Sequence, residues 1–139
     1  MKRLLLAILA TLPLALPACG ATLRVAPVSL EITNGAQAST VRIWNDDREP
    51  LHVQVRIFRS REQGGQTVLE PTQEVVASPP ITTLLPGSEN IIRVVRVSDQ
   101  PVQGRETYRL IVDELPDPSA QQAGTVSILV RHAIPVTFQ

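Results

Sequence analysis

HVQVRIFR, residues 52–59, is the strongest alternation of apolar and polar residues in this 139-residue chain. Its aliphatic side chains stand at alternate positions, Val53, Val55 and Ile57, and most positions between them are polar. Successive side chains of a β-strand point to opposite faces, so this alternation predicts a half-buried strand with one apolar and one polar face.

Outward from this stretch in both directions, short β-branched runs alternate with turn residues about every 8–12 positions. No segment shows a convincing apolar period of 3.6 residues. This spacing predicts an all-β sandwich or barrel. The expected strands are residues 23–32, 39–45, 51–59, 67–70, 81–84, 89–98, 107–114 and 125–138.

Glycine and proline mark the connections between these strands. Gly64-Gly65 predicts a hairpin turn, because glycine reaches positive φ without steric cost. Pro86-Gly87 predicts a second turn. Pro27 lies inside the first expected strand and has no N–H for a ladder, so that strand should lie at a sheet edge or change sheets there. Residues 116–124, PDPSAQQAG, are expected to form a loop.

Residues 1–21 have the pattern of an export signal, which predicts a signal peptide followed by a single domain over residues 22–139. Lys2 and Arg3 form a charged start, an apolar core follows over 4–16, and residues 18–21 are small. The apolar core is interrupted by proline and is short for a membrane span. An uncleaved membrane anchor is the alternative interpretation.

Cys19 is the only cysteine of the chain, so an internal disulfide is excluded. Residues 16–19, LPAC, faintly resemble a lipoprotein signal, which would make Cys19 a lipidated N-terminus. Cleavage after Gly20 or Ala21 would instead leave a mature protein without cysteine.

The composition argues against nucleic-acid binding and against catalysis. Lys plus Arg equals Asp plus Glu, at 13 each, and the chain has only one Trp, one Tyr and two Phe. His52 and His132 are the only histidines, no G-x-S-x-G pattern occurs, and no residues show metal-ligand spacing. We therefore expect no enzyme activity, no catalytic residues, no metal, no cofactor and no small-molecule substrate.

The last expected strand is unusual because both of its faces are apolar. Val126, Ile128 and Val130 fall on one face, and Leu129 falls on the other. An exposed apolar strand at a sheet edge invites aggregation unless a partner covers it. This strand is therefore the first functional hint in the sequence.

Residues 75–87 read VVASPPITTLLPG, and shorter motifs surround them in a fixed order: Asn45-Asp46, Pro50, Arg93, Arg105-Glu106 and Glu114-Leu115-Pro116. From about residue 23 to the end, this order resembles the first domain of PapD-like periplasmic chaperones for pilus subunits. The opening LRVAPV and the closing IPV are similar to the archaic branch. The resemblance implies an immunoglobulin-like Greek-key β-sandwich of about seven strands.

The resemblance also implies donor-strand complementation, in which a chaperone lends its last strand to a pilus subunit that lacks one. Val126, Ile128 and Val130 match the donor positions, with His132 next on that face. The alternative is that these side chains pack into the domain's own core, as we expect for Leu129.

The family has two such domains, and this chain is expected to end with the first, as a shortened gene product or a single-domain relative. The implied partners are pilus subunits and the outer-membrane usher, in the periplasm. A structural pilus or surface module that self-associates by strand exchange is the alternative function. Because the last strand is present, the sequence favours a donor over a recipient.

Well-known members of the family hold the carboxylate at the subunit's C-terminus with an Arg and a Lys. Ser29 and Pro135 align with those positions, and neither supplies a cation. The remaining candidates for an anchor are Arg24, Arg93, Arg109 and Arg131. Arg93 and Glu106 match positions of an ionic network with the second domain; here we expect them to pair with each other or to face solvent.

Overall fold

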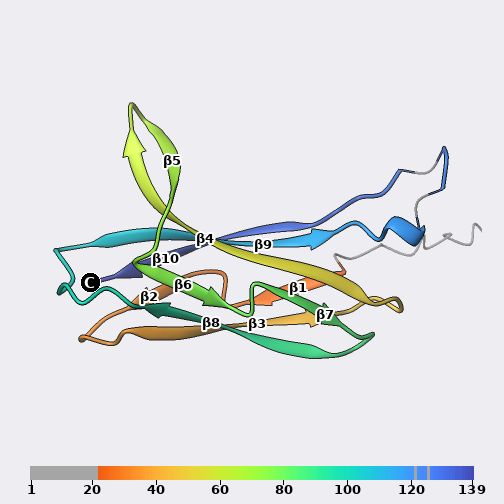
Figure 1. The fold of residues 1–139 in the computed structure, drawn as a ribbon, viewed down its shortest axis with the longest axis horizontal. Helices are drawn as coiled ribbons and strands as arrows, with labels where there is room; N and C mark the ends of the chain where they lie inside the picture. Colours follow the sequence, from red (N-terminus) through yellow and green to blue (C-terminus); the bar gives the residue numbers. More distant parts are fainter. Residues whose placement is uncertain (1–21, 121, 125) are drawn as a thin grey trace, which may run out of the picture.

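The computed structural model describes residues 22–120, 122–124 and 126–139, which form two β-sheets packed on each other (Figure 1). The expected signal segment 1–21, with Cys19, lies outside the described residues. The one helical segment among the described residues is η1, a 3₁₀ turn at Pro118–Ala120. The predicted all-β sandwich is confirmed.

Ten strand segments build the described part of the sandwich. The four-stranded sheet has the order β1 (Leu23–Ala26), β3 (Ala38–Asn45), β8 (Glu89–Arg96), β6 (Val75–Ser78). The six-stranded sheet has the order β2 (Leu30–Ile32), β10 (Arg131–Phe138), β9 (Glu106–Leu115), β4 (Leu51–Gln63), β5 (Gln66–Pro71), and β7 (Ile81–Leu84) also pairs with β4.

The core lies between the two sheets and follows the predicted alternation. Val53 and Val55 of β4 are buried, while Arg56 on the opposite face is exposed. Facing them, strands of the other sheet contribute aliphatic residues at every second position. Tyr108 and Phe138 close one end of the core with an edge-to-face contact, their ring centroids 5.8 Å apart.

The first expected strand changes sheets at Pro27, which is one of the two outcomes that its missing N–H predicted. Residues 23–26 form β1 in the four-stranded sheet, and residues 30–32 form β2 in the six-stranded sheet. Both predicted turns are also confirmed. Gly64 and Gly65 have φ of 60° and 78° between β4 and β5, and Gly87 has φ of 71° between β7 and β8.

The structure departs from the predicted strands most clearly in three places. Residues 75–78 form β6, which the sequence did not predict because this short run gains its stability from pairing with β8. β4 continues to Gln63, beyond the apolar alternation, because β5 pairs with its polar end and Arg61 lies 3.1 Å from Glu70. The last strand is regular only over 131–138, not 125–138.

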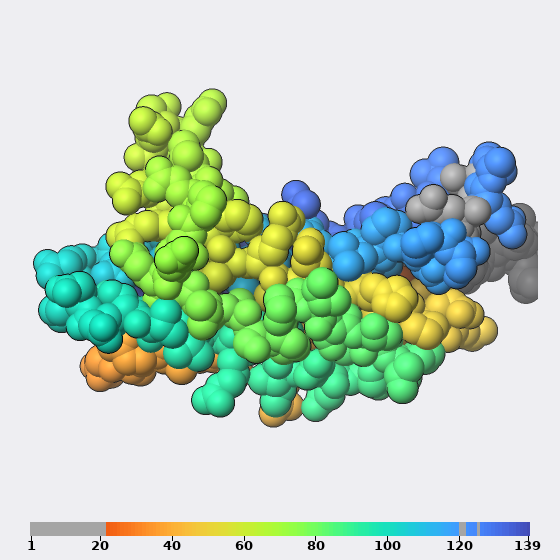
Figure 2. All heavy atoms as spheres, in the orientation of Figure 1, coloured from red at the N-terminus to blue at the C-terminus, as the bar shows by residue number. Residues whose placement is uncertain are grey.

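The hairpin of β4 and β5 rises from the surface near one end of the molecule, and the chain after β9 extends beyond the other end (Figure 2). No helix of the described residues has the length and apolar character needed to cross a membrane.

Candidate functional site

The outer edge of β10 is only partly covered. β2 pairs with it in parallel over Val136–Phe138, and no strand of the described residues pairs with this edge over 131–135. The cause is the change of sheets at Pro27. Residues 23–26 precede β2 in the chain, but they join the other sheet as β1 and so do not cover this edge. The fold therefore leaves a stretch of unpaired strand edge beside the core (Figure 1).

The hydrogen-bond pattern shows which main-chain groups face this uncovered edge. Glu114 N–H donates to the carbonyl of Val130 at 2.9 Å, so these two residues form a hydrogen-bonded pair between β9 and the chain before β10. Such pairs alternate along an antiparallel ladder. Arg131, Ala133 and Pro135 therefore direct their main-chain groups away from β9. Pro135 has no N–H to donate to a neighbouring strand, which suits a position at a sheet edge.

Alternate residues of β10 also fill the core. Ile134, Val136 and Phe138 are buried between the sheets. In an extended chain the same parity continues upstream through His132, Val130, Ile128 and Val126. The face of β10 that packs into the core of this domain thus continues along the chain beyond the end of that core.

Residues 126–130, which we call the free segment, lie mostly in solvent. Val126 is 91% exposed and Ile128 is 85% exposed, whereas Val130 is half-buried. The expectation that Leu129 packs into the core is wrong, since it is 44% exposed. The physical reason is the alternation of β10, in which Ile134, Val136 and Phe138 face the core, so Leu129 has the parity of the opposite face.

His132 differs from the other predicted donor residues, because it already has a partner in its own domain. Its Nε2 lies 2.9 Å from the carbonyl oxygen of Leu23 in β1. His132 therefore bridges the two sheets at the point where the free segment begins, and the exposed apolar face lies upstream of it.

Two of the four predicted anchor cations are already paired. Arg24 donates to both carboxylate oxygens of Asp46, at 2.8 and 3.2 Å, and its guanidinium stacks 4.3 Å from the centroid of a Trp44 ring. The hydrogen bond from Arg24 lowers the pKa of the Asp46 carboxyl. Arg131 donates to Asp113.

Asp113 joins two strands across the outer face of the six-stranded sheet. It accepts from Arg131 of β10 and, at 2.6 Å, from Arg56 of β4. Burial alone would raise the pKa of Asp113, but the hydrogen bonds from these two guanidiniums lower it below its ordinary value. Arg131 is therefore engaged in holding the beginning of β10.

The other two candidates, Arg93 and Arg109, make no ion pair or side-chain hydrogen bond with any described residue. Arg93 is exposed on the four-stranded sheet, away from the β10 edge. Arg109 is half-buried on β9, and its direct cross-strand neighbours are Pro135 of β10 and Phe58 of β4. Of these two candidates, Arg109 is therefore the one that lies next to the end of the uncovered edge.

Arg93 and Glu106 do not pair with each other; Arg93 faces solvent, which was the other expectation, whereas Glu106 is buried. Glu106, 6% exposed, forms a buried two-point ion pair with Arg96, with N–O distances of 2.9 and 3.0 Å. Because alternate residues of β8 point inward, Arg96 faces the core with Ile92 and Val94, whereas Arg93 faces solvent. The inward position of Arg96 was visible in the alternation and could have identified the true partner.

This ion pair belongs to a buried polar network. The Tyr108 hydroxyl lies 2.9 Å from a carboxylate oxygen of Glu74 and 3.1 Å from one of Glu106, either of which accepts its single proton, and Arg59 pairs with Glu74. The hydrogen bonds from Arg96 lower the pKa of Glu106, and burial raises the pKa of Tyr108. The network ties both sheets together at the end of the sandwich opposite the free segment.

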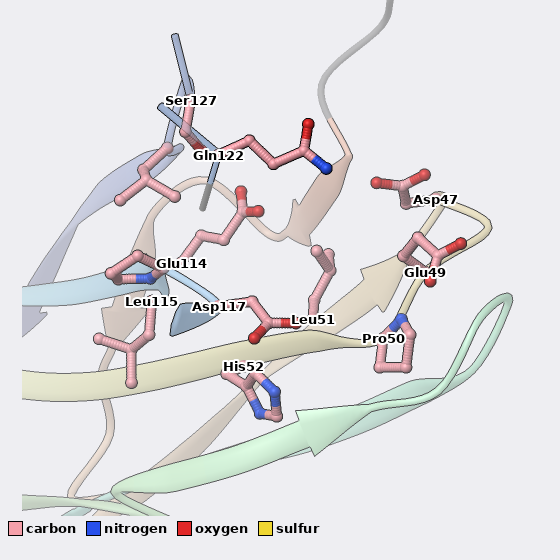
Figure 3. Close-up of a pocket in the computed structure, with 12 residues that line it drawn as sticks. Asp47, Glu49, Pro50, Leu51, His52, Glu114, Leu115, Asp117, Gln122 and Ser127 are labelled. Carbon is pink, nitrogen blue, oxygen red and sulfur yellow. The ribbon is translucent and has the colours of Figure 1, made fainter. Parts of the chain in front are cut away.

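A pocket of about 460 Å³ lies beside the free segment, and sequence reasoning missed it (Figure 3). The turn between β3 and β4 and the end of β9 form its walls, and Leu129 is among the residues that line it. Four carboxylates and no Lys or Arg occur among its described lining residues, which are Asp47, Glu49, Pro50, Leu51, His52, Glu114, Leu115, Pro116, Asp117, Gln122, Ser127 and Leu129. Within the described ranges, no group of side chains is arranged to hold a metal ion.

A sandwich with an uncovered edge strand is suited to β-augmentation by a partner strand. The chain belongs to the family described as pili and flagellar-assembly chaperone, PapD N-terminal domain, whose profile matches residues 22–139. No curated protein sequence matches the chain.

Solved structures of pilus chaperones share the fold. One is a complex of the chaperone CsuC with the tip adhesion subunit CsuE, from archaic Csu pili of Acinetobacter baumannii. It is 26% identical, with a TM-score of 0.73, and the match covers 85% of this chain and 56% of that one. The SafB chaperone with SafA pilin of Salmonella enterica is 15% identical, with a TM-score of 0.66 and coverages of 84% and 53%. The chain thus spans about half the length of these relatives.

Proposed function

We propose that this chain is a periplasmic chaperone domain that captures a pilus subunit by donor-strand complementation. The observation that carries the proposal is the continuation of the core-forming face of β10 into solvent, beside an uncovered edge. Val126 and Ile128 have no core of their own to fill. A pilus subunit with an incomplete sandwich would supply both a neighbouring strand and a core for these side chains.

Side-chain burial would provide most of the affinity. Each fully buried aliphatic side chain contributes ~1.5–3 kcal/mol, so Val126, Ile128 and Val130 together give roughly 5–9 kcal/mol before the cost of association. Each main-chain hydrogen bond of the new ladder adds a net ~0.5–1.5 kcal/mol. Burial thus sets the strength of the complex, and the ladder sets its register.

Arg109 is the best candidate for holding the carboxylate at the end of the guest strand. β2 occupies the edge from Val136 onward, so a guest strand beside β10 has to end near Pro135. Pro135 offers no N–H to a further guest residue, and Arg109 lies directly opposite it on β9. A guanidinium can bind a carboxylate through two parallel hydrogen bonds.

Export through residues 1–21 and delivery of the subunit to the outer-membrane usher complete the proposal. Folding of the subunit around the lent strand would release the free energy that drives capture, so no nucleotide or covalent step is needed.

The test is co-purification with a pilus subunit from the periplasm, comparing the wild-type chain with Ile128→Asp. The charge cannot be buried in the guest, so we expect capture to be lost while the fold is retained. Ile91→Asp is the matched control, because Ile91 is 45% exposed on the outer face of the other sheet. Equal capture by Ile128→Asp and the control would remove the donor assignment. Polymerisation of the chain alone would support a self-associating module instead.

A further inference from the structure

Glu114, near the end of β9, connects three parts of the chain at the base of the free segment. Its N–H donates to the carbonyl of Val130 at 2.9 Å. Its carboxylate oxygen Oε2 accepts from the N–H of Val130 and from the hydroxyl of Thr22, each at 3.4 Å. Thr22 immediately precedes β1, so a single side chain joins β9, the free segment and the beginning of the other sheet.

The side chain of Glu114 competes with the main-chain ladder. In an antiparallel hydrogen-bonded pair, two residues exchange both of their N–H···O=C bonds. Glu114 and Val130 make only one of these bonds, because the carboxylate takes the Val130 N–H in place of the Glu114 carbonyl. Regular pairing consequently ends one step later in β10, at Arg131 opposite Asp113.

The same region closes the opening between β1 and β10. His132 contacts the carbonyl of Leu23, and Glu114 contacts Thr22 one residue earlier. These two contacts lie where the domain's own core ends, next to the free segment that carries the exposed residue Ile128. A guest that adds its core to this end would have to engage the chain next to both contacts.

We propose that Glu114 is a latch that holds the base of the free segment unpaired until a guest strand engages it. On engagement, the Val130 N–H passes from the carboxylate of Glu114 to its main-chain carbonyl, and the β9–β10 ladder gains one pair. Glu114 is a positioning residue in this scheme, since it acts on Val130 and does not touch the guest. The role in capture rests on the proposed chaperone function, whereas the latch itself is a property of the chain alone.

The latch is tested first on the purified chain, by residue-resolved amide hydrogen exchange followed by NMR. In Glu114→Ala the Val130 N–H is free to pair with the main-chain carbonyl, and its protection should rise roughly 2- to 12-fold, the factor equivalent to one net hydrogen bond. Glu114→Gln keeps an acceptor oxygen and should exchange like the wild type. Glu89→Ala removes an exposed carboxylate on the other sheet and should also leave Val130 unchanged.

The second measurement is the rate at which each variant captures the pilus subunit that co-purifies with the wild type. Glu114→Ala should capture faster than the wild type, and Glu114→Gln should match it. Unchanged or reduced protection of Val130 in Glu114→Ala overturns the latch, and raised protection with an unchanged capture rate overturns its role in capture. If the wild type captures no pilus subunit, the chaperone proposal fails, and the exchange result still decides the latch.

Discussion

The two halves of the last chain run, residues 126–130 and 134–138, have similar composition and opposite environments. In the downstream half, Ile134, Val136 and Phe138 are buried, and β9 pairs with the strand throughout. In the upstream half, Val126 and Ile128 lie in solvent without a ladder. An apolar alternation therefore predicts only that one face of a strand is buried. The topology decides whether that face is buried in the core of the same chain.

The largest expected effect comes from placing the same charge in each half. Ile134→Asp puts a carboxylate into a closed core with no partner, which should cost at least ~4 kcal/mol and leave little folded protein. Ile128→Asp places the carboxylate in solvent and should change the free energy of unfolding by less than about 0.5 kcal/mol. Urea denaturation followed by circular dichroism measures both. Similar losses in the two variants would mean that the free segment packs in its own domain.

The buried end of β10 offers a second contrast, because Glu106 lies opposite Phe138 and pairs with Arg96. Glu106→Ala leaves the Arg96 guanidinium buried without its carboxylate, and we expect a loss of ~3–5 kcal/mol of stability. The control is Glu89→Ala, which removes an exposed partner 3.9 Å from Arg42 and should have an effect within about 0.5 kcal/mol. If both variants unfolded at the same urea concentration, the network would have no role in closing that end.

The sequence predicted best those features that depend on one local stretch of the chain. The alternation at residues 53–57, the glycine turns and the change of sheets at Pro27 follow from local stereochemistry, and all of them are present. β6 was missed because its four residues depend on β8. The Arg96–Glu106 pair was not predicted, because the family resemblance pointed to Arg93, which faces solvent.

For the candidate site, the sequence predicted the face but not the point at which it becomes free. Residues 126–138 look like one strand, and only the contacts of Val130 and Arg131 with β9 show where pairing ends. The choice among four arginines also needed the structure, because Arg24 and Arg131 pair with carboxylates far away in the sequence. Whether the free face is donated stays a prediction.

Asp113 marks the boundary between the two halves, and its titration should report on that boundary. Its pKa is lowered in the folded chain, so its stabilising contribution is present above the ordinary value near 4 and is lost as pH falls through the lower folded value. Asp113→Asn should be less stable at pH 7 by about 1 kcal/mol, given the half-exposed guanidiniums, and the two stability curves should converge as pH falls through the lowered folded value. Urea denaturation at several pH values provides the measurement. Parallel curves would show that Asp113 is not the group concerned.

The smallest effect on the fold is expected for Val126→Ala, set against the same change at Val136. Val136 is fully buried, and its truncation should lower the free energy of unfolding by about 2 kcal/mol. Val126 is 91% exposed, and its truncation should leave stability unchanged. If a guest core buries Val126, losing two methyl groups should weaken capture by ~1.5 kcal/mol, or roughly tenfold. Titration of each variant with the captured subunit would distinguish these roles. A Val126→Ala variant with undiminished affinity would limit the donated face to Ile128 and Val130, because only residues enclosed by the guest contribute transfer free energy.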